Sequence, residues 1–302
     1  MTHTSQRIAV AGSSGLIGGA LCRSLRERGD DVIRLVRRPP EHPSQVQWDP
    51  SSRHLDPEVL DGVDAVVNLA GVSLGAQRWS PTFKAELIAS RTDGTTALAA
   101  AIAATGRPIH LVNGSAVGYY GDRGEEVLTE ESTAGSGFLV DLVHAWEGAT
   151  EPARASGAPV ARLRTGIVLA PEGDAIKTLL RLTKLGLGGP LGNGKHYWPW
   201  ITLADHVRAI QHVLDQKLEG PVNLTGPEPA RQRDIVAEMG RQLHRPTLLP
   251  APTFALRLVV GEMAGDIVAS QRALPKRLLD TGFSHEQATL TNAIRWLLAT
   301  PG

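Results

Sequence analysis

Short, almost continuously apolar runs alternate with longer segments of helical periodicity through the first half of the chain. The apolar runs predict strands buried on both faces, and the helical patterns between them predict the crossover helices of a parallel sheet. The expected strands lie at residues 7–12, 31–36, 64–71, 109–116 and 159–170, and the expected helices at 16–29, 81–106 and 137–157. This order predicts an α/β fold of the Rossmann type, with a doubly wound parallel sheet.

The pattern changes after Val168. Residues 185–200, "LGLGGPLGNGKHYWPW", are rich in glycine and aromatic residues and are too irregular to predict a sheet strand. Helical patterns follow over residues 203–215, 230–243, 253–264 and 285–298, with one strand at 221–226. We therefore expect an NADP-binding Rossmann domain over residues 1–168 and a smaller, mostly helical substrate lobe over 169–302, from which the chain can cross back to the sheet.

A glycine-rich turn joins the first expected strand to the first helix. Gly12, Gly15 and Gly18 have the spacing G-x-x-G-x-x-G. In a dinucleotide site the first glycine permits the tight turn, the second lets the backbone approach the pyrophosphate, and the third lets the helix pack on the strand. A plain β–α turn is the alternative, but the complete β–α–β context favours a cofactor site. Its expected residues are Gly12, Ser13, Ser14, Gly15, Leu16, Ile17 and Gly18.

The end of the second strand indicates which dinucleotide is bound. An NAD site places an acidic residue there, about 20 residues beyond the glycines, to bind the ribose hydroxyls. This chain has Val36 at that position, followed by Arg37 and Arg38. An arginine can bind a 2′-phosphate, so the pattern favours NADP(H) over NAD. The alternative is that the two arginines only solvate a loop.

Several motifs together resemble the extended short-chain dehydrogenase/reductase superfamily. They are the glycine turn, "NLAG" at residues 68–71 and "SAVGYYG" at 115–121. Further segments, "RWSPTFKAELIASR", "AWE", "LGLGGPLGNGKHYWPWI" and "GEMAGDIVASQRALPKRLLDTGF", resemble an atypical branch of epimerase-family, nucleoside-diphosphate-sugar-epimerase-like proteins. The resemblance covers nearly the whole chain. It implies cofactor contacts at Val36, Arg37, Leu69, Ala70, Gly71, Glu86, Arg91 and Val168.

Members of the superfamily usually carry a Ser or Thr, a Tyr, and a Lys four residues after the Tyr. In "GFLVDLVHAWE", residues 137–147, the Tyr and Lys positions become Leu139 and Val143, or Phe138 and Leu142 if the register shifts by one. Neither pair titrates, so the usual proton relay is absent, as it is in the atypical branch. The substitutes that we predict for catalysis are Ser115, Tyr119 and Tyr120. Ala116 can occupy the serine position instead, and the tyrosines can simply line the pocket.

The glycine-hinged segment 192–200 supplies the candidate substrate contacts. Polar groups beside aromatic rings suit a small polar or cyclic carbonyl or hydroxyl compound. The alternative is a lid whose aromatic residues only pack. The candidate residues are Lys195, His196, Tyr197 and Trp200.

Composition bounds the remaining possibilities. The chain has 302 residues, with 31 basic and 31 acidic side chains, so its charge favours neither nucleic acid nor a membrane as partner. The single cysteine, Cys22, and an N-terminus without a signal pattern predict a cytoplasmic protein. No residue group has metal-ligand spacing, so we expect no metal.

The function predicted is an NADP(H)-dependent oxidoreductase or epimerase-like protein. The alternatives are a non-catalytic NADPH-binding sensor or interaction protein, and a relative that shares only the fold; the oligomeric state, monomer or homodimer, stays open.

Overall fold

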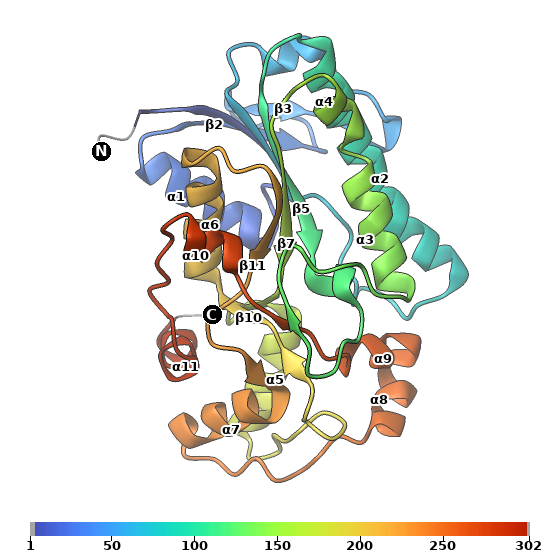
Figure 1. Cartoon of the computed structure of the whole chain (residues 1–302), viewed down its shortest axis with the longest axis vertical. Coiled ribbons are helices and arrows are strands. Elements are labelled where there is room, and N and C mark those ends of the chain that lie inside the picture. The colour runs from blue at the N-terminus through green and yellow to red at the C-terminus, as the bar shows by residue number, and fades with distance from the viewer. Residues whose placement is uncertain (1–3, 301–302) are drawn as a thin grey trace.

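A seven-stranded parallel sheet forms the centre of the computed structural model, which describes residues 4–300 apart from the side chain of Asp174 (Figure 1). The strand order is β11-β7-β5-β4-β1-β2-β3, and every neighbouring pair is parallel. The strands are β1 Arg7–Ala11, β2 Asp31–Val36, β3 Gln45–Gln47, β4 Ala65–Asn68, β5 His110–Ala116, β7 Val160–Thr165 and β11 Gly220–Leu224. The order reverses between β1 and β4, which confirms the predicted Rossmann-type fold.

Helices cover both faces of the sheet, so the central strands are buried on each side (Figure 1). Alternate residues of β1 illustrate this: Ile8 and Val10 pack toward one face, and Ala9 and Ala11 toward the other. The first face is covered by α1 Leu16–Glu27, α6 Leu203–Asp215 and α10 Lys276–Asp280, and the second by α2 Pro81–Ala104, α3 Phe138–Gly148 and α4 Glu151–Ala155. Burial on both faces explains why the strands are almost continuously apolar in sequence.

A second, smaller lobe with its own hydrophobic cluster lies below the sheet in Figure 1. Its helices are α5 Asp174–Lys184, α7 Gln232–Leu243, α8 Thr253–Val260, α9 Ala264–Ile267 and α11 Leu290–Ala299. Its short strands are β8 Ile167–Leu169, β9 Tyr197–Trp198, β10 Trp200–Thr202 and β12 Ala230–Arg231, while β6 Val127–Leu128 pairs with β13 Arg272–Ala273. The strand predicted at 221–226 belongs to the main sheet as β11, so the chain returns from the lobe to the sheet.

Several predicted elements differ from the structure. The helix predicted over 137–157 is two helices, α3 and α4, and the helix predicted over 285–298 begins only at Leu290. The strand predicted over 159–170 is divided at Gly166, where a Cβ would lie 2.0 Å from the Pro199 carbonyl oxygen, so the chain changes partner there. The helix predicted over 253–264 ends at Gly261, whose φ is +68°. The prediction that 185–200 contains no strand is wrong, because Tyr197–Trp198 and Trp200–Thr202 pair with β12 and β8.

Candidate functional site

The glycine turn between β1 and α1 is closed by contacts that only glycine permits. Gly12 has a φ of +75°, and a Cβ there would lie 2.6 Å from the Leu69 carbonyl carbon. A Cβ on Gly18 would lie 2.2 Å from the Gly12 carbonyl oxygen. The Gly15 amide donates to that same oxygen at 3.1 Å. Gly12 and Gly18 therefore bring the turn, the first helix and the end of β4 into close contact.

The N-terminus of α1 is open to an anion. Its N-cap, Gly15, provides no side chain to accept from the first amide groups, and the first turn contains no acidic residue. Free amide groups and the positive end of the helix dipole favour a phosphate at this position. Leu16, the first residue of the helix, is exposed. Gly173 lies close to both Leu16 and Val168: a Cβ added at Gly173 would be 3.6 Å from Leu16 Cδ2 and 3.8 Å from the Val168 carbonyl oxygen. The structure thus brings the predicted contacts Leu16 and Val168 to one place.

The end of β2 presents arginines and no acid. Val36 is buried, and Arg37 is exposed without an ion pair to any other residue in the described part of the chain. Arg38 pairs with Glu41, with 3.1 Å between Nη2 and Oε2. Arg34, which was not predicted as a site residue, donates from Nη2 to the Ser13 carbonyl at 3.2 Å. The available signal was a charged residue in the middle of an apolar strand.

A buried amide network holds the turn at the end of β4. The Asn68 Nδ2 donates to Thr95 Oγ1 at 2.9 Å and to Asn113 Oδ1 at 2.8 Å, and the Asn68 Oδ1 accepts from the Ala70 amide at 3.2 Å. The Leu69 amide donates to the Ala11 carbonyl at 3.0 Å. Leu69 and Ala70 therefore have fixed backbones beside the glycine turn. The sequence motif "NLAG" located this turn, but Thr95 and Asn113 were not predicted.

Arg91 on α2 lies against Gly71, whereas Glu86 is exposed. The Arg91 guanidinium donates to the carbonyls of Leu87 at 3.1 Å and Val72 at 3.0 Å, and a Cβ on Gly71 would lie 3.3 Å from its Cζ. Burial lowers the pKa of Arg91 to about 10. The structure brings Arg91 to the turn at the end of β4, and it leaves Glu86 exposed on α2, without a hydrogen bond or ion pair to another residue within 4–300.

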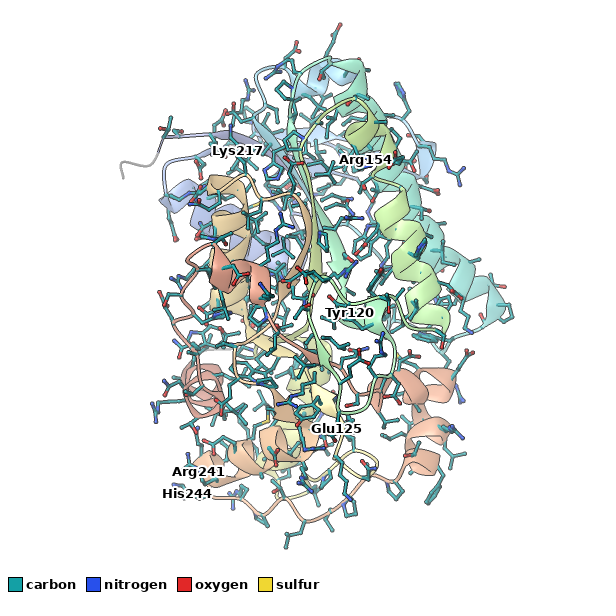
Figure 2. The ribbon with its side chains drawn as sticks, viewed as in Figure 1. Tyr120, Glu125, Arg154, Lys217, Arg241 and His244 are labelled. Carbon is teal, nitrogen blue, oxygen red and sulfur yellow. The ribbon has the colours of Figure 1, made fainter. Side chains whose placement is uncertain are left out.

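The three predicted catalytic residues meet in a buried polar network. Ser115 Oγ donates to Glu147 Oε1 at 2.6 Å. Arg164 donates to both Glu147 oxygens, from Nε at 2.9 Å and from Nη2 at 3.1 Å. Arg164 Nη1 also donates, at 3.2 Å, to the hydroxyl of Tyr120, which is labelled in Figure 2. The network joins β5, α3 and β7.

The tyrosines of this network are held by Arg164. The Tyr120 hydroxyl donates to Asn223 Oδ1 at 2.7 Å, and burial raises the pKa of Tyr120 despite the nearby positive charge. The Arg164 Cζ lies 3.4 Å from the centre of the Tyr119 ring. Burial alone would lower the pKa of Arg164, but its hydrogen bonds to Glu147 and the opposite charge raise it. Glu147 and Arg164 were not predicted as site residues.

Helix α3 packs against the turn that follows β5. A Cβ on Gly118 would lie 3.3 Å from Leu139 Cβ and 3.9 Å from Val143 Cγ2. Val143 is 1% exposed, and the helix contains neither a tyrosine nor a lysine. In this structure the helix therefore contributes apolar packing at both positions.

The predicted substrate contacts in segment 192–200 differ in exposure. Lys195 is exposed, and Tyr197 is half-buried with its ring centre 4.6 Å from the Arg231 Cζ. His196 is buried, neither ring nitrogen has a hydrogen-bond partner among the described residues, and burial lowers its pKa. Trp200 is 1% exposed and packs on Gly226, where a Cβ would lie 2.9 Å from the indole. Trp200 is a core residue in this structure.

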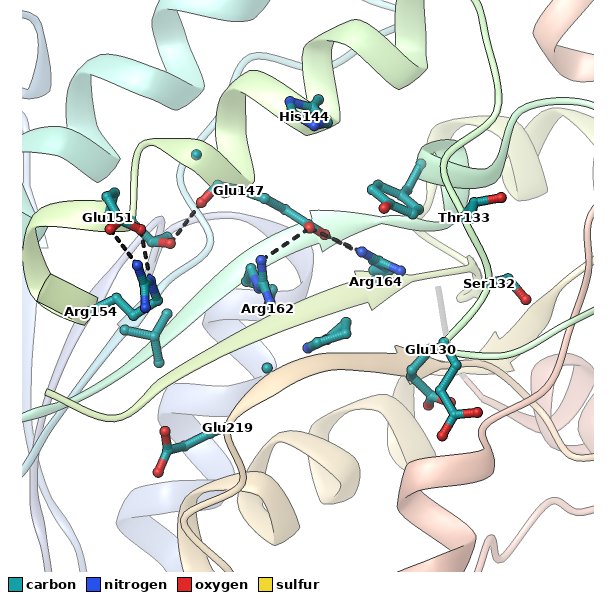
Figure 3. Close-up of a pocket in the computed structure, with 17 residues that line it drawn as sticks. Glu130, Ser132, Thr133, His144, Glu147, Glu151, Arg154, Arg162, Arg164 and Glu219 are labelled. Carbon is teal, nitrogen blue, oxygen red and sulfur yellow. Dashed lines mark hydrogen bonds and ion pairs between the residues drawn. The ribbon is translucent and has the colours of Figure 1, made fainter. Parts of the chain in front are cut away.

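A charged cavity of about 520 Å³ lies beside the buried network, between α3, α4 and the strands β7 and β11 (Figure 3). Tyr119 and Glu147 reach it from the network, and His144 reaches it from the exposed face of α3. Arg162 lines it too, with Nη1 3.7 Å from Glu147 Oε2. Arg164 lines the cavity together with Tyr119. Within residues 4–300, no cluster of three metal-binding side chains is found, and no helix is both long and apolar enough to cross a membrane.

Comparisons with known proteins place this geometry in context. Residues 8–225 match the NAD dependent epimerase/dehydratase family, and residues 251–297 match a domain of unknown function, DUF1731. The epimerase family protein Mb2239 of Mycobacterium bovis is 44% identical over 98% of each chain. The mouse epimerase family protein SDR39U1 is 34% identical over 97% of this chain and all of its own. A crystal structure of human SDR39U1 with NADPH, 31% identical, superposes with a TM-score of 0.88 over 96% of this chain and 98% of the human one.

Proposed function

Because the chain belongs to the NAD-dependent epimerase/dehydratase family, we propose that it binds NADP(H) and acts as an oxidoreductase of the extended short-chain dehydrogenase/reductase type. In this proposal the enzyme works without the usual Tyr-x-x-x-Lys pair. Its substrate is a small polar or cyclic carbonyl or hydroxyl compound, and it acts in the cytoplasm, where the buried thiol of Cys22 would stay reduced.

The observation that carries the cofactor proposal is the arrangement around the glycine turn. An uncapped helix N-terminus lies beside the strand that ends at Val36, where an NAD site would have an acid. Arg37 follows this residue and forms no ion pair with any residue within 4–300. A cation there favours the additional phosphate of NADP(H). The NADPH found with the human relative supports the same choice.

Residues of this chain would orient the cofactor as follows. The amide groups of the glycine turn would bind the pyrophosphate, and Arg37 the 2′-phosphate. The rigid backbone of Leu69 and Ala70 would support the adenosine side of the site, and Val168 would lie beside the nicotinamide. NADPH supplies the hydride when bound, so the protein must position a carbonyl and stabilise its oxygen.

Reduction of a carbonyl also requires a proton donor near the nicotinamide. Ser115 donates its hydroxyl hydrogen to Glu147, and Tyr120 donates to Asn223, so two of the three predicted catalytic hydroxyls are already engaged. This supports a second candidate function, a non-catalytic NADPH-binding sensor or interaction protein. The packing of Leu139 and Val143 on Gly118 favours that candidate as well.

Calorimetric titration with NADPH and NADH tests the cofactor proposal. We expect tight NADPH binding, weak NADH binding, and a loss of about ten- to hundredfold in NADPH affinity for Arg37→Ala, because a charged hydrogen bond to phosphate is lost. Arg241→Ala, on the surface of the lobe and paired with Glu238, is the matched control (Figure 2). If the wild-type protein does not bind NADPH, the proposal is wrong. The rate of NADPH oxidation is then measured with each of a panel of small carbonyl compounds. Oxidation with one of them supports the oxidoreductase, and no oxidation with any supports the non-catalytic NADPH-binding protein.

A further inference from the structure

Arg34 lies in the middle of strand β2 and has no counterion in the part of the chain that the structure describes. Its neighbours Val32, Ile33, Leu35 and Val36 are buried, and its own side chain is half-buried. The guanidinium donates once, from Nη2 to the Ser13 carbonyl. Its Nε is buried without a hydrogen-bond partner, and within residues 4–300 the guanidinium forms no ion pair with a carboxylate. A cation in such surroundings is unfavourable unless an anion compensates it.

Ser13, in the glycine turn, has a second unsatisfied donor. The residue is 2% exposed, and its hydroxyl has no hydrogen-bond partner among the described residues. Buried hydroxyls are nearly always hydrogen-bonded in native proteins. Because Arg34 already contacts the Ser13 backbone, the two unsatisfied donors belong to one small region. An anionic oxygen acceptor at this point would satisfy both.

The position of Arg34 in the strand explains how it can reach this region. Residues 34 and 36 point to the same face of β2 because side chains alternate along a strand. Residue 36 is where an NAD site places its ribose-binding acid, so a long side chain starting at residue 34 can extend to the same end of the strand. The hydrogen bond to Ser13 shows that the Arg34 guanidinium does extend to the glycine turn.

We propose that Arg34 and the Ser13 hydroxyl form the inner half of a 2′-phosphate site, and that Arg37 forms the outer half. This inference rests on the proposed binding of NADP(H) and adds a buried determinant of NADP specificity. Arg37 is exposed to solvent, which weakens its interactions, whereas the half-buried Arg34 is less screened. Arg34 therefore contributes at least as much as Arg37 to the preference for the phosphorylated cofactor.

The competing explanation is that Arg34 only holds the glycine turn through the Ser13 carbonyl. A purely structural role would affect every dinucleotide equally, whereas phosphate recognition affects only ligands that carry the 2′-phosphate. The test therefore compares four ligands by calorimetry. NADPH and 2′,5′-ADP carry the phosphate, and NADH and 5′-AMP lack it.

For Arg34→Gln, we expect NADPH and 2′,5′-ADP to bind about ten- to hundredfold more weakly, and NADH and 5′-AMP to stay within about twofold. The loss of NADPH affinity at rising salt should also become less steep, since one cation no longer contacts phosphate. Ser13→Ala should lose up to about tenfold, again only for the phosphorylated ligands. Arg241→Gln serves as the control.

Equal weakening of all four ligands by Arg34→Gln would show that Arg34 only supports the turn, and unchanged binding would show that it has no role; either result overturns the inference. Thermal melting of each variant without ligand shows whether the fold is retained. If Arg34→Gln fails to fold, Arg34→Lys is titrated with the same four ligands. Lysine keeps the charge but loses the planar fork of the guanidinium, so only NADPH and 2′,5′-ADP should bind more weakly. The inference is distinct from the cofactor proposal, which is wrong only if the wild-type protein does not bind NADPH.

Discussion

Arg164 and Glu147 form a two-point ion pair inside the molecule, with Nε 2.9 Å from Oε1 and Nη2 3.1 Å from Oε2. Their side chains are only 4% and 6% exposed. Ser115 donates to the same carboxylate, and Arg164 donates to Tyr120, so the pair connects β5, β7 and α3. Charges at this depth are tolerated because each has its partner and further hydrogen bonds.

Removing one charge of this pair should be strongly destabilising. Glu147→Gln leaves the Arg164 guanidinium buried without a counterion, so we expect the free energy of unfolding to fall by about 3–5 kcal/mol. Urea denaturation measures the change. Glu151→Gln removes an exposed partner of Arg154 and should cost less than about 1 kcal/mol. An equal loss of unfolding free energy in the two variants would mean that the buried pair stabilises the fold no more than the exposed pair does.

Burial of His110 predicts a loss of stability in acid. The ring Nε2 donates to the Leu218 carbonyl at 2.9 Å, and burial lowers its pKa from 6.5 to about 4. As the pH falls, His110 therefore takes up a proton in the unfolded chain before it does so in the folded protein. The stabilisation is complete above pH 6.5 and is lost as the pH falls toward about 4, with a slope of up to about 1.4 kcal/mol per pH unit.

The measurement is the free energy of unfolding between pH 4 and 7 for wild type and His110→Leu. Although the variant is less stable at neutral pH, its curve should be flatter, because one titrating group is removed. His206, whose pKa burial also lowers to about 4, keeps part of the slope in the variant. His54→Leu, at an exposed histidine, should leave the slope as in wild type. A His110→Leu curve parallel to wild type would rule out this linkage.

The sequence predicted the sheet well because burial on both faces makes its strands recognisable. It predicted the glycine turn equally well, since Gly12 and Gly18 are required by contacts that admit no Cβ. The ends of helices and strands that are set by tertiary contacts were harder to predict from the sequence. Gly166, for example, divides the strand predicted over 159–170 only because Pro199, distant in sequence, lies against it.

The polar part of the candidate site could not be read from local patterns. Glu147 stands in an ordinary amphipathic helix, and Arg164 in a strand, so their pairing depends on the packing of α3 over β7. The same holds for Asn68 and Asn113, which meet only because β4 and β5 are neighbours. Trp200, interpreted as a candidate substrate contact, is drawn into the core by its pairing with β8.

Helix α3 should not tolerate a lysine at its inward face. Val143 is 1% exposed and contacts Gly118, so Val143→Lys would bury a cation among apolar neighbours. We expect a loss of at least about 3 kcal/mol in the free energy of unfolding, measured by urea denaturation. His144→Lys, at the adjacent exposed position, should stay within about 0.5 kcal/mol of wild type. A stable Val143→Lys protein would show that this position can accommodate the lysine of the usual catalytic pair.

Two adjacent glycines of α1 should respond in opposite ways to alanine. At Gly18 a Cβ would lie 2.2 Å from the Gly12 carbonyl oxygen, so Gly18→Ala must displace the turn. We expect this variant to lose about 1–3 kcal/mol in the free energy of unfolding and to bind NADPH more weakly. At Gly19 the nearest atom would be 3.8 Å away, and alanine should stabilise the helix by about 0.5–1 kcal/mol with binding unchanged. Thermal melting and calorimetry measure both effects. If Gly18→Ala bound NADPH as wild type does, the close packing of the turn would not be needed for the cofactor site.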